Sequence, residues 1–280
     1  SSKMNILIFL IIFLIIGLPT VNGQIELRSG WEIIDTDFDE DIFSIISTED
    51  DQIWGFGESG LIITSNDGGN NWEKKESITE NNLTASDYLD GTILVSGTNG
   101  TVLHKVQDNA WNIINIPDEN VDIKGVALSS TDSYFIIGHN GIIWHYDGFE
   151  WDNISFSDNQ NYNSISFIDG DGLNGIIVGE DGIILTTLDG GINWERIDFP
   201  SIRDENLISL QLLSDSRAYA TTENGHIIVS RGLDTSIGFD WDLVNNESFT
   251  GNSDGLINNV EVVNSLKIII SGQNNIIATS

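Results

Sequence analysis

The stretch that decides the fold spans residues 178–194 and reads VGEDGIILTTLDGGINW. It combines a Gly-x-x-Gly turn at Gly179–Gly182, an apolar run at Ile183–Leu185 and a second turn that ends in Trp194. Asn-Gly and Asp-Gly pairs supply the positive φ that tight hairpin turns need, and β-branched runs favour strands. The stretch therefore predicts strands joined by two tight turns.

The same features recur along the chain in units of about forty residues. The Gly-x-x-Gly turn returns in phase at 57–60, 97–100 and 138–141, with variants at 222–225 and 272–275. The tryptophans in phase with it are Trp31, Trp72, Trp111, Trp151, Trp194 and Trp241. They delimit units at 31–71, 72–110, 111–150, 151–193, 194–240 and 241–280. Each unit reads as four strands, which is typical of a propeller blade.

We therefore predict an all-β chain whose residues 24–280 form one six-bladed β-propeller of four-stranded antiparallel blades. The first, inner strands are expected near Ile45, Leu83, Val121, Ile165, Leu207 and Ile257, and each fourth strand is expected to begin at the tryptophan. Ser280 aligns with the end of a third strand, so the last unit lacks a fourth. Trp31–Ile34 resembles a fourth strand and would close the ring. The alternative is a seventh blade lost by truncation.

Two units carry a sharper turn between the third and fourth strands. Residues 65–72 read SNDGGNNW and residues 187–194 read TLDGGINW. The Asp is expected to accept backbone N–H bonds, the Gly to take positive φ and the Trp to cover the hairpin. We assign a structural role to Ser65, Asp67, Gly69, Trp72, Thr187, Asp189, Gly191 and Trp194. Unit three keeps only Asp147, Gly148 and Trp151, and unit five is expected to have an expanded loop at Gly232–Asp240.

Both turns resemble the Asp box, Ser/Thr-x-Asp-x-Gly-x-x-Trp. The longer pattern at Val178–Trp194, and nearly as well at Gly57–Trp72, is similar to the propeller family of the photosystem II assembly and stability factor. The resemblance implies a propeller that binds protein partners. Asp boxes also occur in sialidases and sortilin-type receptors, so the motif identifies a propeller better than a function.

The charge balance restricts the partners. The formal net charge is −32, from 43 Asp and Glu against 11 Lys and Arg. Such a surface repels phosphate backbones and anionic lipids, so nucleic acid and membrane-surface partners are not expected. The chain has no cysteine, which excludes disulfides and thiolate chemistry. We expect a monomer without a cofactor.

The amino-terminal segment predicts export. Ile6–Ile16 is an unbroken apolar run, shorter than the roughly 20 residues of a transmembrane helix, and Val21-Asn22-Gly23 offers a cleavage site. We therefore expect residues 1–23 to be a secretory signal peptide and the remainder to be secreted or extracytoplasmic. An uncleaved anchor helix is the alternative.

Candidate sites for chemistry are weak. Asp169 and Asp171 lie in an Asp-Gly-Asp-Gly run, but calcium needs 6–8 oxygen ligands, so a solvated turn is favoured. His104 and His145 occupy equivalent positions, and packing is favoured over a shared metal. Sialidases resemble one another in clamping a carboxylate with three arginines. Arg196, in a peripheral fourth strand, is poorly placed for such a clamp.

The Gly-x-x-Gly turns are expected to share one face with the connections between units. That face would present Glu58, His139, Glu180, Asp181 and Glu223 as candidate binding residues. We therefore expect a non-enzymatic scaffold or assembly factor whose partner is another protein. The alternative is a carbohydrate-binding or glycan-hydrolysing propeller.

Overall fold

The computed structural model describes residues 38–48, 52–118, 120–156, 160–168, 172–213, 217–224, 226–234, 238–244, 257–264, 267–272 and 277–279. Contacts divide the chain into two compact units, one up to Leu83 and the other from Thr84. The predicted signal peptide 1–23, the proposed closing strand Trp31–Ile34, the candidate ligands Asp169 and Asp171, and Ser280 all lie outside the described residues.

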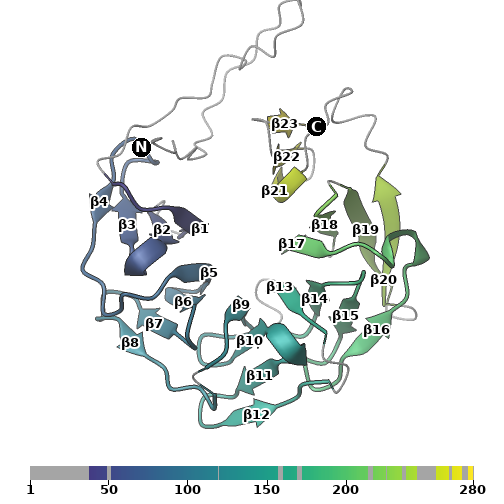
Figure 1. The fold of residues 1–280 in the computed structure, drawn as a ribbon, viewed down its shortest axis with the longest axis horizontal. Coiled ribbons are helices and arrows are strands. Elements are labelled where there is room, and N and C mark those ends of the chain that lie inside the picture. The colour runs from purple at the N-terminus through teal and green to yellow at the C-terminus, as the bar shows by residue number, and fades with distance from the viewer. Residues whose placement is uncertain are drawn as a thin grey trace, which may run out of the picture. The chain divides into compact units, whose positions relative to one another are not determined.

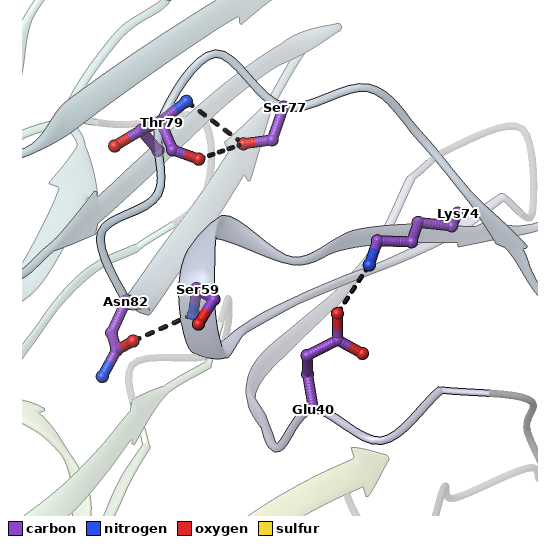
Figure 2. Close-up of polar contacts among 6 residues, drawn as sticks. All are labelled: Glu40, Ser59, Lys74, Ser77, Thr79 and Asn82. Carbon is purple, nitrogen blue, oxygen red and sulfur yellow. Dashed lines mark hydrogen bonds and ion pairs between the residues drawn. The ribbon is translucent and has the colours of Figure 1, made fainter.

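The first unit contains one antiparallel sheet in the order β1-β2-β3-β4 (Figure 1). Its strands are β1 (Ile42–Ser47), β2 (Ile53–Gly57), β3 (Ile62–Ser65) and β4 (Glu73–Lys74). The middle strands are apolar and buried, whereas β4 is exposed. Lys74 Nζ reaches Glu40 Oε1 at 2.6 Å and links β4 to the segment before β1 (Figure 2). Such an exposed ion pair contributes about 0–1 kcal/mol.

The second unit contains four four-stranded antiparallel sheets followed by a three-stranded one, within the part of the chain that the structure describes. The first two comprise β5 (Leu83–Leu89), β6 (Thr92–Gly97), β7 (Val102–Val106) and β8 (Asn112–Ile113), then β9 (Ile123–Leu128), β10 (Tyr134–Gly138), β11 (Ile143–Tyr146) and β12 (Trp151–Asn153). The next two comprise β13 (Tyr162–Phe167), β14 (Gly175–Gly179), β15 (Ile184–Thr187) and β16 (Glu195–Ile197), then β17 (Leu207–Leu212), β18 (Ala218–Thr222), β19 (Ile227–Asp234) and β20 (Gly238–Val244). The last comprises β21 (Ile257–Asn264), β22 (Lys267–Gly272) and β23 (Ile277–Thr279).

Successive sheets of this unit pack through their first strands. β9 contacts β13, β13 contacts β17, and β17 contacts β21. The apolar residues between sheets form buried clusters; in one of them, Phe135 of β10 and Phe167 of β13 stack with ring centroids 4.9 Å apart. Burial of one sheet face against the next is what lets each short sheet persist. These observations confirm the predicted all-β class built from four-stranded antiparallel units, the architecture of a β-propeller.

The predicted strand positions are largely confirmed. The six first strands fall where the repeat places them, although β9 begins at Ile123 instead of near Val121. The expectation that fourth strands begin at the tryptophan is confirmed for β12 at Trp151 but is wrong by one residue for β4, β8 and β16. It is also wrong for β20, which begins at Gly238, three residues before Trp241. In β4 the reason is local, since Trp72 Nε1 donates to Gly69 O at 2.8 Å and keeps the tryptophan within the turn.

One predicted loop is wrong. Gly232–Asp240 was expected to be expanded loop, yet β19 runs to Asp234 and β20 begins at Gly238. The pairs Leu233↔Phe239 and Asp234↔Gly238 extend the ladder beyond a register shift after Ser230. A β-bulge of this kind accommodates extra residues without ending the hairpin. The prediction of a loop was wrong because it rested only on the extra length of this unit.

Helical structure among the described residues is limited to 3₁₀ turns, at η1 (Glu58–Gly60), η2 (His139–Gly141) and η3 (Pro200–Ile202). Over the same residues, nothing helical has the length and apolar character needed to cross a bilayer.

Candidate functional site

The Gly-x-x-Gly turns have a common backbone geometry. Their third residues take positive φ at Ser59, Asn99, Asn140 and Asp181, as do the glycines that follow each of them. The first glycine serves a different purpose, because Gly57 and Gly138 are extended. A Cβ on Gly138 would lie 2.6 Å from the carbonyl oxygen of Asp122. Glycine therefore permits close packing at the first positions Gly57 and Gly138, and it permits positive φ at the fourth position of these four turns.

Each turn is bound by the residue that precedes the next first strand. The backbone N–H of Ser59 donates to Asn82 Oδ1 at 2.9 Å in the first unit (Figure 2). In the second unit the corresponding bonds run from Asn99 to Asp122 at 3.2 Å, from Asn140 to Asn161 at 3.0 Å and from Asp181 to Asn206 at 3.1 Å. We name Asn82, Asp122, Asn161 and Asn206 the linking residues.

The linking residues connect the candidate binding residues of the second unit. Asn206 accepts the Asp181 N–H through Oδ1 and donates through Nδ2 to Glu223 at 3.0 Å. Asn161 likewise donates through Nδ2 to Glu180 at 2.8 Å and accepts the Asn140 N–H, next to His139. Hydrogen bonds through Asn161 and Asn206 thus join three successive turns, at 138–141, 179–182 and 222–224, into one polar surface. We name this surface the turn face.

Glu58 belongs to the first unit. It is exposed, and its N–H donates to Asp41 O at 2.8 Å. It repeats the arrangement of Glu180 and Glu223, whose N–H groups donate to Asn161 O and Asn206 O at 2.9 and 2.8 Å.

Sequence reasoning missed a side-chain hydrogen bond on the turn face. His226 Nδ1 lies 2.6 Å from Glu205 Oε2, and Glu205 O accepts the Gly182 N–H at 2.6 Å. For the linking residues, the missed signal was an Asx residue directly before the first strands β1, β5, β9, β13 and β17, in phase with the repeat. The turn face therefore gathers the acidic residues Glu180, Asp181, Glu205 and Glu223, with His226 beside Glu205.

The first Asp turn, residues 65–72, is organised by its carboxylate. Asp67 Oδ1 accepts the Ser65 hydroxyl at 2.8 Å and the Asn71 N–H at 2.9 Å, and Oδ2 accepts Asn71 Nδ2 at 2.6 Å. The Asn71 side chain, then its backbone and Ser65, lower the pKa of Asp67 to about 2. Ser65 Oγ also accepts the buried N–H of Gly69 at 2.7 Å.

The second Asp turn, residues 187–194, repeats this network. Asp189 Oδ1 accepts the Thr187 hydroxyl at 2.9 Å and the Asn193 N–H at 2.9 Å, and Thr187 Oγ1 accepts the Gly191 N–H at 2.8 Å. Burial opposes ionisation of Asp189, but hydrogen bonds from Asn193 and Thr187 outweigh it and lower the pKa. Trp194 meets Phe135 and Phe167 edge to face. Both carboxylates are thus occupied by their own turns.

Comparison with known proteins now identifies the family. The sequence model of the family described as "Photosynthesis system II assembly factor YCF48" matches residues 103–264, more than half of the chain. The chain belongs to the YCF48 family.

Curated relatives of this YCF48-family chain match over a shorter stretch. The chain is 34% identical over 83 residues to the "Photosystem II stability/assembly factor HCF136, chloroplastic" of Arabidopsis thaliana and 31% identical over 83 residues to that of Oryza sativa subsp. japonica. These matches cover 30% of this chain and 19% and 18% of the two relatives, so the chain spans under a fifth of their length.

Solved structures of low identity share the fold. YCF48 from Cyanidioschyzon merolae has a TM-score of 0.65 at 15% identity, covering 85% of this chain and 81% of its own. A structure described as YCF48 bound to D1 peptide has the same TM-score and identity, covering 85% and 77%. Virginiamycin B lyase from Staphylococcus aureus has a TM-score of 0.68 at 12% identity, covering 90% and 83%. The fold is therefore shared with both binding proteins and an enzyme.

Of the remaining titratable candidates of the YCF48-family chain, the two histidines lie in packing positions and the arginines lie at the surface. His145 stacks on Phe135 at 4.3 Å, and its Nε2 lies 2.8 Å from Ser133 Oγ. Burial lowers the pKa of both His104 and His145. Arg196 lies in β16, and Arg203 pairs with Asp198 at 2.8 Å on the surface. Among the described residues, no three His, Cys, Asp or Glu side chains gather as metal ligands would.

Proposed function

We propose that the chain is a non-enzymatic assembly factor that binds a segment of a partner protein on the turn face. The observation that carries the proposal is the family match over residues 103–264. It is supported by the likeness to a YCF48 structure described as bound to D1 peptide. The turn face suits such a role, because backbone turns held by the linking residues give a rigid platform for exposed side chains.

The proposed partner segment is basic. The turn face carries Glu180, Asp181, Glu205 and Glu223, on a chain of net charge −32. A negative surface steers positively charged partners toward it and accelerates their association at low salt. Photosystem polypeptides are one source of such a segment, and other extracytoplasmic complexes are another.

We extend the proposal to the architecture and the location. The proposed molecule is a monomeric six-bladed ring in which Trp31–Ile34 supplies the fourth strand of the last blade. Support comes from the three-stranded sheet β21-β22-β23, which follows complete four-stranded sheets. The apolar run Ile6–Ile16 supports export. Deleting residues 24–36 from the exported chain should lower its thermal midpoint by several degrees if that strand closes the ring; an unchanged midpoint would refute closure.

The binding proposal is tested by affinity capture from the organism that makes the protein, using the exported chain as bait. Glu180→Gln, Asp181→Asn and Glu223→Gln together should reduce recovery of the captured protein at least fivefold. Glu195→Gln, an exposed residue of β16, is the matched control and should leave recovery unchanged. Equal recovery with all variants would refute the turn face as the binding surface.

The alternative function is carbohydrate binding or glycan hydrolysis. This alternative is supported by the similar fold of an enzyme, virginiamycin B lyase. A fluorogenic sialoside assay and a glycan array separate the two functions. Turnover of the sialoside, or selective glycan binding, would overturn the assembly-factor proposal.

A further inference from the structure

The loops of the third and fourth repeat units expose large apolar side chains. The exposed fraction is 92% for Phe149, 77% for Ile192, 53% for Leu173 and 40% for Leu188. They lie on the turns that join first to second and third to fourth strands. Those turns are at the opposite end of the sheets from the turn face, so they form a separate surface.

The loops that carry these side chains are connected. The Gly190 N–H donates to Leu173 O at 2.8 Å, and a Cβ on Gly190 would lie 4.0 Å from Leu173 Cδ2. Gly172 packs against Ser129 O of the turn at 129–133, and Gly148 packs near Asp132 of that same turn. The loops that carry Leu173, Leu188 and Ile192 therefore lie side by side, and the loop that carries Phe149 packs against the same turn at 129–133 as Gly172 does. We name these four residues the loop patch.

Folding does not require apolar residues at two of these positions. The first Asp turn makes the same Asp, hydroxyl and Asn hydrogen bonds as the second, and it carries Asn66 and Asn70 where the second carries Leu188 and Ile192. The turn is therefore built equally well with polar side chains. Exposed leucine and isoleucine have a cost in solubility, and contiguous exposed apolar surface marks interaction sites.

The charges around the patch favour a basic occupant. The four loops at 129–133, 147–150, 172–174 and 188–194 contain Asp132, Asp147, Glu150 and Asp189 and no Lys or Arg. Backbone N–H groups of Glu150 and Phe149 lower the pKa of Asp147, so it is ionised at neutral pH. This acidity, with the net charge of −32, opposes both a second copy of the chain and an anionic lipid surface.

We propose that the loop patch is a second docking surface, which binds an amphipathic basic segment of a partner protein. Apolar side chains of that segment cover Leu188, Ile192 and Leu173, and its Lys or Arg residues face Asp147 and Glu150. An apolar centre with a polar, charged rim is the usual construction of a protein interface.

The test uses the full exported chain and two labelled peptides, one alternating Leu and Lys in an amphipathic pattern and one with every Leu replaced by Ser. Fluorescence anisotropy at physiological salt measures binding. The Leu/Lys peptide should bind, and the Ser/Lys peptide should bind at least roughly tenfold more weakly, because burial of apolar side chains is lost. Leu188→Asn with Ile192→Asn should weaken binding of the Leu/Lys peptide by a similar factor.

The matched control is Ile113→Asn, which replaces an apolar side chain of comparable exposure, 58%, on β8 outside the patch. It should leave the affinity unchanged. Equal weakening by Ile113→Asn, or equal affinity for the two peptides, would overturn the proposal. Binding to phosphatidylglycerol vesicles, or a dimer that Leu188→Asn with Ile192→Asn abolishes, would also overturn it by assigning the patch to lipid or to a second copy. Glu180→Gln with Glu223→Gln, on the turn face, is a second control and should leave the affinity for the Leu/Lys peptide unchanged. Loss of binding in that variant would assign the peptide to the turn face and overturn the second docking surface alone.

Discussion

The two Asp turns, at residues 65–72 and 187–194, have the same hydrogen-bonded framework and differ in what surrounds it. In the first, the Trp72 indole donates to its own turn at Gly69 O, and Asn70 Nδ2 donates to Asp67 O at 2.6 Å. In the second, Trp194 packs edge to face on Phe135 and Phe167, and leucine and isoleucine replace the two exposed asparagines. The framework is therefore structural, and the variable positions are free to serve packing or binding.

The largest expected effect is a loss of stability when Gly191 of the second Asp turn, which packs against Phe135, is replaced. Gly190 and Gly191 have φ of +76° and +84°, so alanine is strained at both. At Gly191 a Cβ would also overlap the Phe135 ring. Gly191→Ala should reduce the free energy of unfolding by about 3 kcal/mol, since overpacking adds to strain. Gly190→Ala should cost about 1–2 kcal/mol, mainly from backbone strain, because its Cβ would approach Gly172 O only to 3.2 Å and would meet no ring.

Urea denaturation followed by tryptophan fluorescence measures both losses. Equal costs at the two glycines would show that Phe135 moves aside, and the distinction between turn strain and core contact would be lost.

Sequence reasoning predicted the framework because its signals are local. The Asp, the glycines and the tryptophan sit within eight residues, and turn chemistry alone determines their roles. The linking residues were missed although Asn161 and Asn206 recur in phase, because their partners lie about 21–25 residues away in the preceding unit. The apolar patch was missed because strand-like residues such as Leu188 and Ile192 are read as buried until the structure shows their exposure.

The next largest effect is expected when the hydroxyl group is removed from either Asp turn, and it tests whether both turns depend on that group for stability. Ser65→Ala and Thr187→Val each remove the hydroxyl that accepts a buried glycine N–H. A buried donor left unsatisfied costs about 1–3 kcal/mol, so both variants should lose about 2 kcal/mol of unfolding free energy. Thermal or urea unfolding measures the loss. A cost at only one of the two sites would mean that the second turn depends on its tryptophan packing in place of the hydroxyl.

A smaller effect is expected in acid, because Asp67 titrates near pH 2 in the folded chain. Its folded pKa lies below the ordinary value of about 3.9, so its contribution to stability is complete above about pH 4 and is lost as the pH falls toward 2. Asn71→Ala removes the strongest hydrogen bond to the carboxylate and should raise the pKa of Asp67 toward its ordinary value, as measured by carboxyl ¹³C NMR titration.

Asn70→Ala is the matched control for that titration. Its side chain donates to the Asp67 backbone carbonyl and leaves the carboxylate untouched. The pKa of Asp67 in the Asn70→Ala variant should therefore remain near 2. A similar rise in both variants would assign the low pKa to the shape of the turn as a whole.

The smallest effect on stability is expected when the exposed residues of the two Asp turns are exchanged. Leu188→Asn with Ile192→Asn should change the free energy of unfolding by no more than about 0.5 kcal/mol, as is usual for surface positions. The reverse exchange, Asn66→Leu with Asn70→Ile, removes exposed side-chain bonds to Gln52 and Asp67 and should cost about 1 kcal/mol or less. Urea denaturation of both double variants measures these changes. A loss of several kcal/mol in the first exchange would mean that Leu188 and Ile192 support the fold, and their exposure would then no longer argue for a docking surface.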